Sequence, residues 1–328
     1  MALLLGYNDV KRLLTMRDCI SVIEQAFIDY ASSRANVPLR LKVLAPEERG
    51  AGYFMPGALN SRPDPAYGIK IVTEFASNKE RGLPSILGII VLLDPNTGRA
   101  LAIMDGRYIT AMRTGAASGV AAKYLAREDA QSAGILGLGE QAFVQLWAIT
   151  EIRSISSIRA YSPSGKRRSR WVDEISHSIG APIEIVASPE EACRDADIII
   201  LATNHAGSVI DGDWVKRGAF VNAIGFHTPT CGELDGKTIE KADLIVCDER
   251  EAALRESGDI ISAVEREIIK RDDLINLGDI VLGKAAGRES PQQITIYRSL
   301  GNAFQDLATA NYVYNRARDG GMGIEFDF

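Results

Sequence analysis

The chain has 328 residues, of which 46% are hydrophobic and 24% charged, and its formal net charge is −6. This length suits two domains of ordinary size, each with enough core to fold by itself. The acidic balance disfavours a nucleic-acid-binding protein, which usually carries a basic surface.

The first region, residues 1 to about 106, combines helical and strand-like patterns. Asn8 is a plausible cap for a short helix over residues 9–14, and residues 16–31 place apolar side chains at helical spacing. Runs of β-forming residues then predict several strands, the last two joined by a turn at residues 94–98. These strands are expected at residues 39–44, 51–55, 68–73, 85–93 and 100–104.

An alanine-rich helix over residues 107–126 leads into a region, about 130–300, in which strands alternate with helices. That alternation predicts a doubly wound parallel sheet of the Rossmann type, so the fold class is α/β. Its strands are expected at residues 132–138, 157–161, 183–186, 198–202, 219–224 and 244–247. A last helix, residues 302–319, cannot extend a parallel sheet, and we expect it to pack on the first region.

Cysteine and histidine usage narrows the class further. The four cysteines are scattered without CxxC spacing, and the three histidines are not paired at ligand spacing. We therefore expect no disulfide framework and no metal site. The opening apolar run is too short for a signal peptide or a membrane span, so the chain reads as a soluble cytoplasmic protein without membrane or nucleic-acid partners.

The strongest local motif is a glycine-rich turn at Gly137-Leu138-Gly139-Glu140-Gln141-Ala142, which follows a buried strand and opens a helix. In a dinucleotide-binding turn the first glycine permits the tight turn, the second lets backbone approach a pyrophosphate, and the small third residue allows close helix–strand contact. The strand–turn–helix context favours a dinucleotide site. The alternative is a glycine-rich turn that holds no ligand.

The residues after the second parallel strand bear on the choice between NAD and NADP. A carboxylate there would bind the ribose 2′-hydroxyl of NAD, but residues 159–168 contain none. Ser162, Ser164 and the basic cluster that includes Arg167 suit a 2′-phosphate, which favours NADP(H). A solvated basic helix start is the alternative and leaves NAD(H) possible.

Several separated motifs together resemble the ornithine cyclodeaminase/mu-crystallin family over nearly the whole chain. They are Val37-Pro38-Leu39-Arg40, Met55-Pro56-Gly57, Gly68-Ile69-Lys70, Gly82-Leu83-Pro84-Ser85, Met104-Asp105-Gly106, residues 110–118, the glycine-rich turn and Ser299-Leu300-Gly301. The family includes cyclodeaminases, archaeal-type alanine dehydrogenases and imine reductases. The resemblance therefore implies a nicotinamide enzyme that acts at an amino-acid α-carbon.

The resemblance also implies an architecture, with the Rossmann sheet inserted in a mixed α+β domain and a homodimer as the assembly. The substrate and dimerisation domain would comprise residues 1–115 and 302–328, and the dinucleotide-binding domain residues 116–301. The residues expected to contact the dinucleotide are Ser85, Thr114, Gly137, Gly139, Glu140, Gln141, Ala142, Ser162, Ser164, Arg167, Ala202, Thr203, Asn204, Ile224, Gly225, Ser299, Leu300 and Gly301.

Three basic residues are candidates for the substrate site. Arginine binds a carboxylate through two parallel hydrogen bonds, and Arg40 and Arg113 match the family's carboxylate-binding arginines. Lys70 lies within an apolar strand, where desolvation lowers a lysine pKa into the range useful for proton transfer, and it matches the family's active-site lysine. Surface arginines and an edge-strand lysine are the alternatives. Met55 is expected to line the substrate pocket or to belong to the core.

His227 stands where the cyclodeaminases of the family carry an aspartate that their chemistry needs. A histidine relays protons near neutral pH but supplies no fixed negative charge. We therefore expect an NAD(P)H-dependent reductase of α-imino acids, or a dehydrogenase that aminates a small 2-oxo acid, with Lys70 and His227 as catalytic residues. A cyclodeaminase with recycled NAD and a non-catalytic small-ligand-binding protein are the alternatives.

Overall fold

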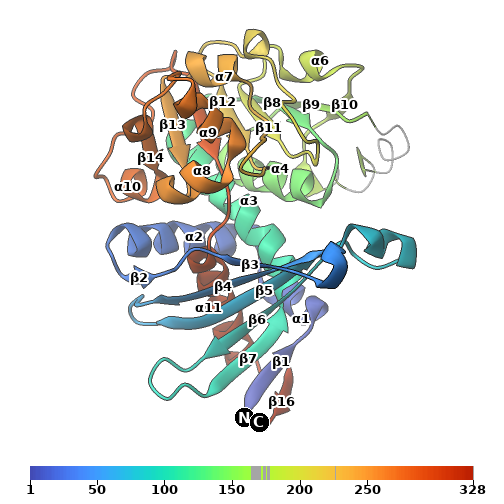
Figure 1. The fold of residues 1–328 in the computed structure, drawn as a ribbon, viewed down its shortest axis with the longest axis vertical. Coiled ribbons are helices and arrows are strands. Elements are labelled where there is room, and N and C mark those ends of the chain that lie inside the picture. The colour runs from blue at the N-terminus through green and yellow to red at the C-terminus, as the bar shows by residue number, and fades with distance from the viewer. Residues whose placement is uncertain (164–170, 173–174, 176–177, 226, 328) are drawn as a thin grey trace. The chain divides into compact units, whose positions relative to one another are not determined.

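The computed structural model describes the whole chain except residues 164–170, 173–174, 176–177, 226 and 328 (Figure 1). The chain divides into two compact units, the first made of Met1–Arg113 and Gly301–Phe328 and the second of Thr114–Leu300. The first boundary falls inside one continuous helix, α3 (Gly106–Leu125). None of the described helices combines the length and the apolar character needed to cross a membrane.

The first unit is built on a mixed sheet of eight strands in the order β16-β1-β7-β6-β5-β4-β2, with β3 also paired to β4. The two terminal strands pair with each other, so the chain ends lie side by side (Figure 1). The strands are β1 (Ala2–Leu5), β2 (Ala35–Asn36), β3 (Leu41–Leu44), β4 (Ala51–Leu59), β5 (Ala66–Glu74), β6 (Ile86–Leu93), β7 (Ala100–Asp105) and β16 (Ile324–Phe326). Its helices are α1 (Tyr7–Leu13), α2 (Met16–Ala31) and α11 (Ala303–Asp319), with 3₁₀ turns at Pro46–Glu48 and Ala76–Arg81.

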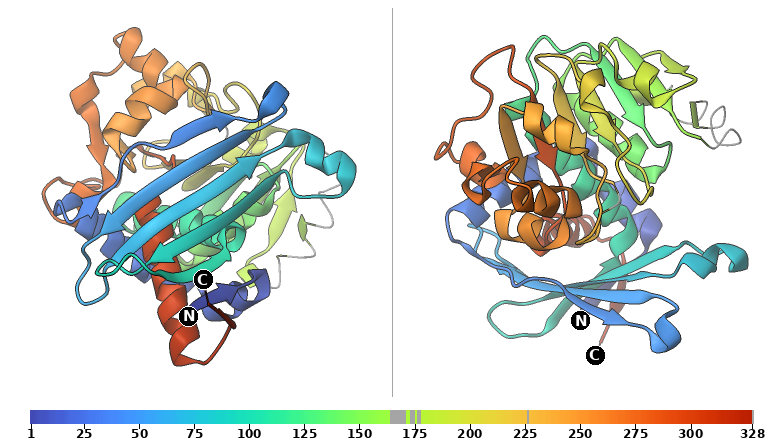
Figure 2. Two further views of the ribbon diagram at one scale, coloured as in Figure 1. Left: turned by 60° about the horizontal axis from the view of Figure 1, so that its bottom comes forward. Right: turned by 45° about the horizontal axis from the view of Figure 1, so that its top comes forward.

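One face of this sheet is covered by helices. Helix α11 packs against β4, β5, β6 and α2, and in the left view of Figure 2 it crosses behind the sheet as the red helix. Alternate residues of a strand point to opposite faces, so Ala66, Gly68 and Lys70 of β5 face the helices and are buried. The expected packing of the last helix on the first region is confirmed.

The opposite face of the sheet carries apolar side chains that remain accessible. Leu41, Val43, Tyr67 and Ile89 are 62%, 47%, 42% and 46% exposed. They come from β3, β5 and β6, where alternation directs them away from α11. We call this surface the open sheet face. An apolar surface that extends over three strands is typical of an interaction site.

The second unit contains a sheet of eight strands, all parallel, in the order β10-β9-β8-β11-β12-β15-β13-β14. The predicted doubly wound parallel sheet is confirmed. The strands are β8 (Ser132–Leu136), β9 (Ser157–Tyr161), β10 (Ile183–Ile185), β11 (Ile198–Leu201), β12 (Phe220–Ala223), β13 (Leu244–Cys247), β14 (Leu274–Asn276) and β15 (Thr295–Arg298). The helices described between them are α4 (Glu140–Ile152), α6 (Pro189–Cys193), α7 (Gly236–Lys241), α8 (Arg250–Glu256), α9 (Gly258–Glu265) and α10 (Leu277–Val281), with 3₁₀ turns at Gly212–Trp214 and Arg271–Asp273.

Some sequence predictions were wrong or incomplete. The first helix is capped by Gly6 rather than by Asn8, because the Asp9 carboxylate accepts a 3.0 Å hydrogen bond from the backbone N–H of Gly6. Strands β1, β2, β14, β15 and β16 were not predicted. Strand β15 lies between β12 and β13 in the middle of the parallel sheet, so the missed strand is a central one.

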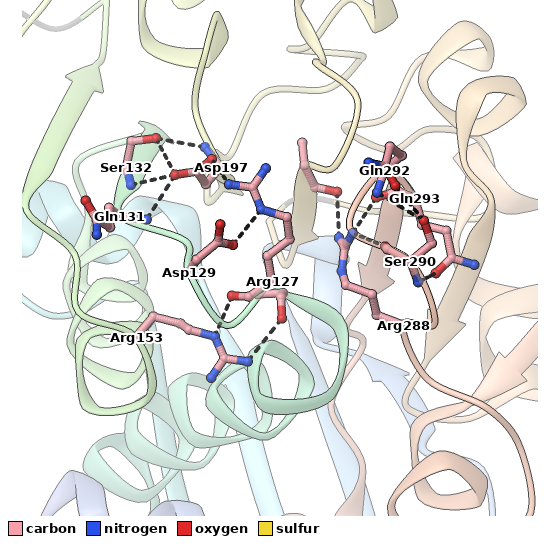
Figure 3. A network of polar contacts seen from close by, with 12 residues as sticks. Arg127, Asp129, Gln131, Ser132, Arg153, Asp197, Arg288, Ser290, Gln292 and Gln293 are labelled. Atoms are coloured by element: carbon pink, nitrogen blue, oxygen red, sulfur yellow. Dashed lines mark hydrogen bonds and ion pairs between the residues drawn. The ribbon is translucent and has the colours of Figure 1, made fainter.

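A polar network ties together the amino-terminal ends of the parallel strands (Figure 3). Asp197, just before β11, accepts hydrogen bonds from the backbone N–H groups of Gln131 and Ser132 at 2.9 and 3.0 Å. It also forms ion pairs with Arg127 and Lys216 at 3.0 and 2.8 Å. Asp197 therefore joins the starts of β8 and β11 at the edge of the sheet opposite to the glycine-rich turn.

Two further arginines bind main-chain carbonyls near the end of α3. Arg153 donates to the carbonyls of Ala122, Ala126 and Arg127 at 3.1, 3.0 and 2.8 Å, which satisfies groups that a helix end leaves unpaired. Arg288 donates to the carbonyl of Leu125 at 2.6 Å, and burial lowers its pKa to about 10. Both side chains serve the framework of the second unit.

Candidate active site

Lys70 lies in the middle of β5, on the face of the sheet that α11 covers, and is 1% exposed. Its neighbours across the strands are Met55 on β4 and Ile90 on β6, which are also buried. The lysine stem thus lies in an apolar row, and the Nζ atom reaches the Asp306 Oδ2 of α11 at 2.6 Å. The alternative of an edge-strand lysine that points to water is wrong.

The protein environment of Lys70 stabilises the neutral amine relative to the ammonium form more than water does. Burial lowers the pKa of Lys70 from 10.5 to about 7, Asp306 opposes this, and the charges of Arg113 and Arg40 lower the pKa further. A group with a pKa near neutrality both gives and takes a proton readily, which is the property of a general acid–base catalyst. The role of Lys70 in proton transfer stays a prediction.

Asp306 is shared between two cations. Its Oδ1 atom lies 2.9 Å from the Nε of Arg113, while its Oδ2 atom binds Lys70. Arg113, nearly buried in α3, also donates from Nη1 to the Oε1 of Gln305 at 2.9 Å. One buried carboxylate therefore neutralises only part of the charge of Lys70 and Arg113, which leaves the site suited to a substrate anion.

Arg40 and Arg113 meet at Gly301. The Nη2 of Arg40 donates to the carbonyl of Gly301 at 3.1 Å. Gly301 has a φ of 75°, and a Cβ atom at this position would overlap with the guanidinium of Arg113. The structure thus brings together Lys70, Arg113, Asp306 and Arg40, which we call the cationic cluster. The role predicted for Gly301 at the dinucleotide stays a prediction.

Sequence reasoning did not find Asp306 or Gln305. The signal was present, because Asp306 is an acid between Ala303, Leu307 and Ala310 on the apolar face of a helix. An unpaired carboxylate does not persist at such a buried position, so a basic partner was implied.

In the second unit the glycine-rich turn joins β8 to α4 at the point where the strand order reverses, between β8 and β11. Ligands of doubly wound sheets bind at this position. Gly137 has a φ of 100°, and a Cβ atom there would overlap with the carbonyl of Ala202 after β11. Gly139 has no atom within 4 Å of where a Cβ would lie, so its surroundings are open.

The start of α4 fits a pyrophosphate group. The buried Ala142 allows close packing of helix and strand, and the N-terminus of the helix presents backbone donors and positive potential. The Oε1 atom of Gln141 is buried and has no hydrogen-bond partner among the described residues. A donor supplied by a ligand would satisfy it. Glu140 begins the helix with its side chain exposed.

The other residues expected at the dinucleotide are distributed as follows. Ser162 is buried at the end of β9, while Ser164 and Arg167 lie outside the described residues. Ser85 belongs to the first unit and Thr114 begins the second. The remaining ones follow the carboxyl ends of β11, β12 and β15, and are Ala202, Thr203, Asn204, Ile224, Gly225, Ser299 and Leu300.

Two buried carboxylates that sequence reasoning missed bind these strand ends. Asp248 accepts from the backbone N–H of Leu300 at 2.8 Å and from the hydroxyl of Ser299 at 3.2 Å. Glu233 accepts from Thr203 and Gly225. Both lie beyond the elements that carry the motifs, and only the fold brings them to the strand ends.

His227 is half-buried in the loop after β12, and its Nδ1 atom lies 3.1 Å from the carbonyl oxygen of Gly225. Its predicted catalytic role stays a prediction. In the part of the chain that the structure describes, no group of three or more His, Cys, Asp and Glu residues is placed to hold a metal ion.

Known proteins match this chain over nearly its whole length. The model of the ornithine cyclodeaminase/mu-crystallin family matches residues 2–321. A Δ1-pyrroline-2-carboxylate reductase of Bacillus cereus is 35% identical over 327 residues, which are 99% of this chain and 100% of the relative.

Two solved structures are similar over almost their full length. The Thermococcus litoralis Δ1-pyrroline-2-carboxylate reductase in complex with NADH and L-proline has a TM-score of 0.94 and 39% identity, covering 99% of this chain and 100% of that one. An archaeal alanine dehydrogenase dimer with bound NAD has a TM-score of 0.92 and 34% identity, covering 100% and 99%. These matches confirm the resemblance seen in the sequence motifs, and the chain belongs to the ornithine cyclodeaminase/mu-crystallin family.

Proposed function

We propose that this protein is an NAD(P)H-dependent oxidoreductase that reduces an α-imino acid of the Δ1-pyrroline-2-carboxylate or ketimine type to an L-amino acid. The observation that carries the proposal is the cationic cluster, in which a lysine with a pKa of about 7 lies beside two arginines. The similarity to two Δ1-pyrroline-2-carboxylate reductases and an alanine dehydrogenase supports the same reaction class.

The cluster suits both charges that an imino acid presents. Arg40 and Arg113 bind the carboxylate, and their planar guanidinium groups fix its orientation. The ammonium of Lys70 gives a proton to the imine nitrogen. A reduced nicotinamide held at the glycine-rich turn would supply the hydride for the imine carbon. The C=N double bond thereby becomes a CH–NH single bond, and a neutral Lys70 remains to be reprotonated. Met55, beside Lys70 across the strand pair, is the apolar contact for the substrate.

We propose that the dinucleotide binds at the glycine-rich turn and that NADPH is favoured over NADH. The preference rests on the absence of a carboxylate from residues 159–168 and on the hydroxyl of Ser162 after β9. The two solved relatives hold NADH and NAD, respectively.

The decisive experiment follows the oxidation of NADPH, with NADH in parallel, on Δ1-pyrroline-2-carboxylate. Rapid oxidation with formation of L-proline is the expected result, with a higher kcat/KM for NADPH. If neither cofactor is oxidised, linear imines from pyruvate or glyoxylate and an amine are the next substrates. Release of ammonia from ornithine without added cofactor would contradict the proposal and identify a cyclodeaminase.

We also propose that the protein is a homodimer joined through the open sheet face, as its apolar character and the dimeric state of the alanine dehydrogenase relative support. Light scattering should give twice the chain mass of 35.6 kDa. The Ile89→Lys variant should give a monomer, because it buries a charge in the interface. Leu83→Lys, at an exposed apolar residue before β6, is the matched control and should remain dimeric. A dimeric Ile89→Lys variant would assign the interface elsewhere.

A further inference from the structure

Glu233 is a fully buried carboxylate that binds the ends of two neighbouring strands. Its Oε1 atom accepts hydrogen bonds from the backbone N–H and the hydroxyl of Thr203, at 2.8 and 2.6 Å. Its Oε2 atom accepts from the backbone N–H of Gly225 at 2.7 Å. Thr203 follows β11 and Gly225 follows β12, and these strands are paired in parallel. A single side chain therefore fixes the separation of the two loops that leave the carboxyl edge of the sheet.

The contact with Gly225 is close enough to exclude a side chain there. A Cβ atom on Gly225 would overlap with both carboxylate oxygens of Glu233. The glycine thus allows the carboxylate to reach the main chain.

The same peptide segment orients His227. The carbonyl of Gly225 lies 3.1 Å from the Nδ1 of His227, and a carbonyl oxygen can only accept a hydrogen bond. Nδ1 is therefore the donor in this contact. Glu233 holds the N–H of the glycine whose carbonyl accepts this hydrogen bond.

The net effect of the surroundings is to raise the pKa of Glu233. Burial raises the pKa of Glu233, while the hydrogen bonds from Thr203 and the charge of Arg298 lower it. Arg298, itself fully buried, donates from Nε to the hydroxyl of Ser257 at 2.7 Å and lies 3.4 Å from Asp259. Ser257 and Asp259 are buried as well.

We propose that Glu233 is a positioning residue for the nicotinamide half of the dinucleotide, which acts by holding Thr203, Gly225 and, through Gly225, His227. This inference rests on the proposed function, in which the protein binds a dinucleotide. Ligands of doubly wound sheets bind beyond the carboxyl ends of the strands, where Thr203 and Gly225 lie. It implies that two affinities can be separated. Loss of the carboxylate should weaken the binding of the cofactor, and the binding of the imino acid by the cationic cluster should stay unchanged.

The test compares Glu233→Gln with Asp197→Asn. The amide of glutamine would present N–H groups to the N–H of Gly225, so one strand end loses its acceptor. Asp197 also accepts main-chain N–H bonds, but at the opposite edge of the sheet. We expect the Kd of NADPH or NADH, measured by fluorescence titration, to rise about 10-fold or more in Glu233→Gln. We expect the KM for the imino acid to stay within about 2-fold. Asp197→Asn should lower Tm and leave the cofactor Kd unchanged.

Each alternative outcome has a definite meaning. Equal cofactor Kd in wild type and a folded Glu233→Gln variant overturns the inference and leaves the proposed reductase intact. If the wild-type protein binds neither dinucleotide, the proposed function and the inference both fail. If Glu233→Gln does not fold, Thr203→Val removes one hydrogen bond to Glu233, and Thr203→Ser retains it. Weaker cofactor binding in the valine variant alone supports the positioning role of Glu233. Equal cofactor affinity in the two variants overturns it.

Discussion

The Lys70→Met variant should lose about 10²–10⁴-fold in kcat for imine reduction, the range contributed by a positioned general acid. Methionine matches the lysine stem in length and fits the apolar row between Met55 and Ile90, so little packing is lost. The dinucleotide Kd should be unchanged, because the glycine-rich turn belongs to the other unit. Steady-state kinetics and a cofactor titration on the same sample give both quantities.

The matched control is Lys42→Met, which removes an exposed lysine from β3 of the same unit. Its turnover should equal that of the wild type. Unimpaired turnover of Lys70→Met would remove Lys70 from the mechanism.

The pH dependence of the wild type should report the same group. Because the pKa of Lys70 is about 7, its ammonium form predominates below that pH and is lost above it. The kcat/KM for reduction should therefore fall as the pH rises through about 7. Oxidation of the L-amino acid needs the neutral amine and should rise over the same interval. Neither inflection should remain in Lys70→Met.

The Asp306→Asn variant should show the second large effect. It leaves the buried cations of Lys70 and Arg113 without their shared anion, and breaking a buried ion pair typically destabilises a protein by about 3–5 kcal/mol. Since Asp306 raises the pKa of Lys70, its loss should also shift the reduction profile to lower pH. Chemical denaturation and a pH series of kcat/KM measure these two consequences.

Asp29→Asn separates the two effects. Asp29 is a buried carboxylate of the same unit that accepts from Gln25 at 3.1 Å and pairs with Arg34 at 2.7 Å, away from the charges that shift the pKa of Lys70. This variant should lose stability and keep the wild-type pH profile. An unshifted profile in Asp306→Asn would mean that Asp306 is a purely structural partner.

The sequence predicts those parts of the fold that depend on local patterns. Helices α2 and α11 and most strands of both sheets follow from apolar periodicity, and the glycine-rich turn follows from residues adjacent in the chain. Strand β15 was not predicted, because its four residues, Thr295–Arg298, include an arginine, a residue that is usually exposed. In the fold that arginine is fully buried, held by Ser257 and the carbonyl of Ala223.

The same distinction applies to the candidate site. Lys70 and Arg113 were recognisable because each is a lone charge in an apolar stretch. Asp306 binds Arg113, which lies 193 positions away along the chain, and Glu233 binds Thr203, which lies 30 positions away. Their partners are set by tertiary contacts, which no periodicity records. Ser164 and Arg167, on which part of the cofactor prediction depends, lie outside the described residues.

The discontinuous first unit has a consequence for the order of events during synthesis. The ribosome completes β1 to β7 and must then translate the whole of Thr114–Leu300 before α11 emerges. At about 5–20 residues per second this takes roughly 10–40 seconds, long enough for the intervening unit to fold first. During that interval Lys70 and Arg113 have no Asp306, and the sheet has no helix α11 to cover it. The arrival of α11 therefore both covers the sheet and assembles the cationic cluster.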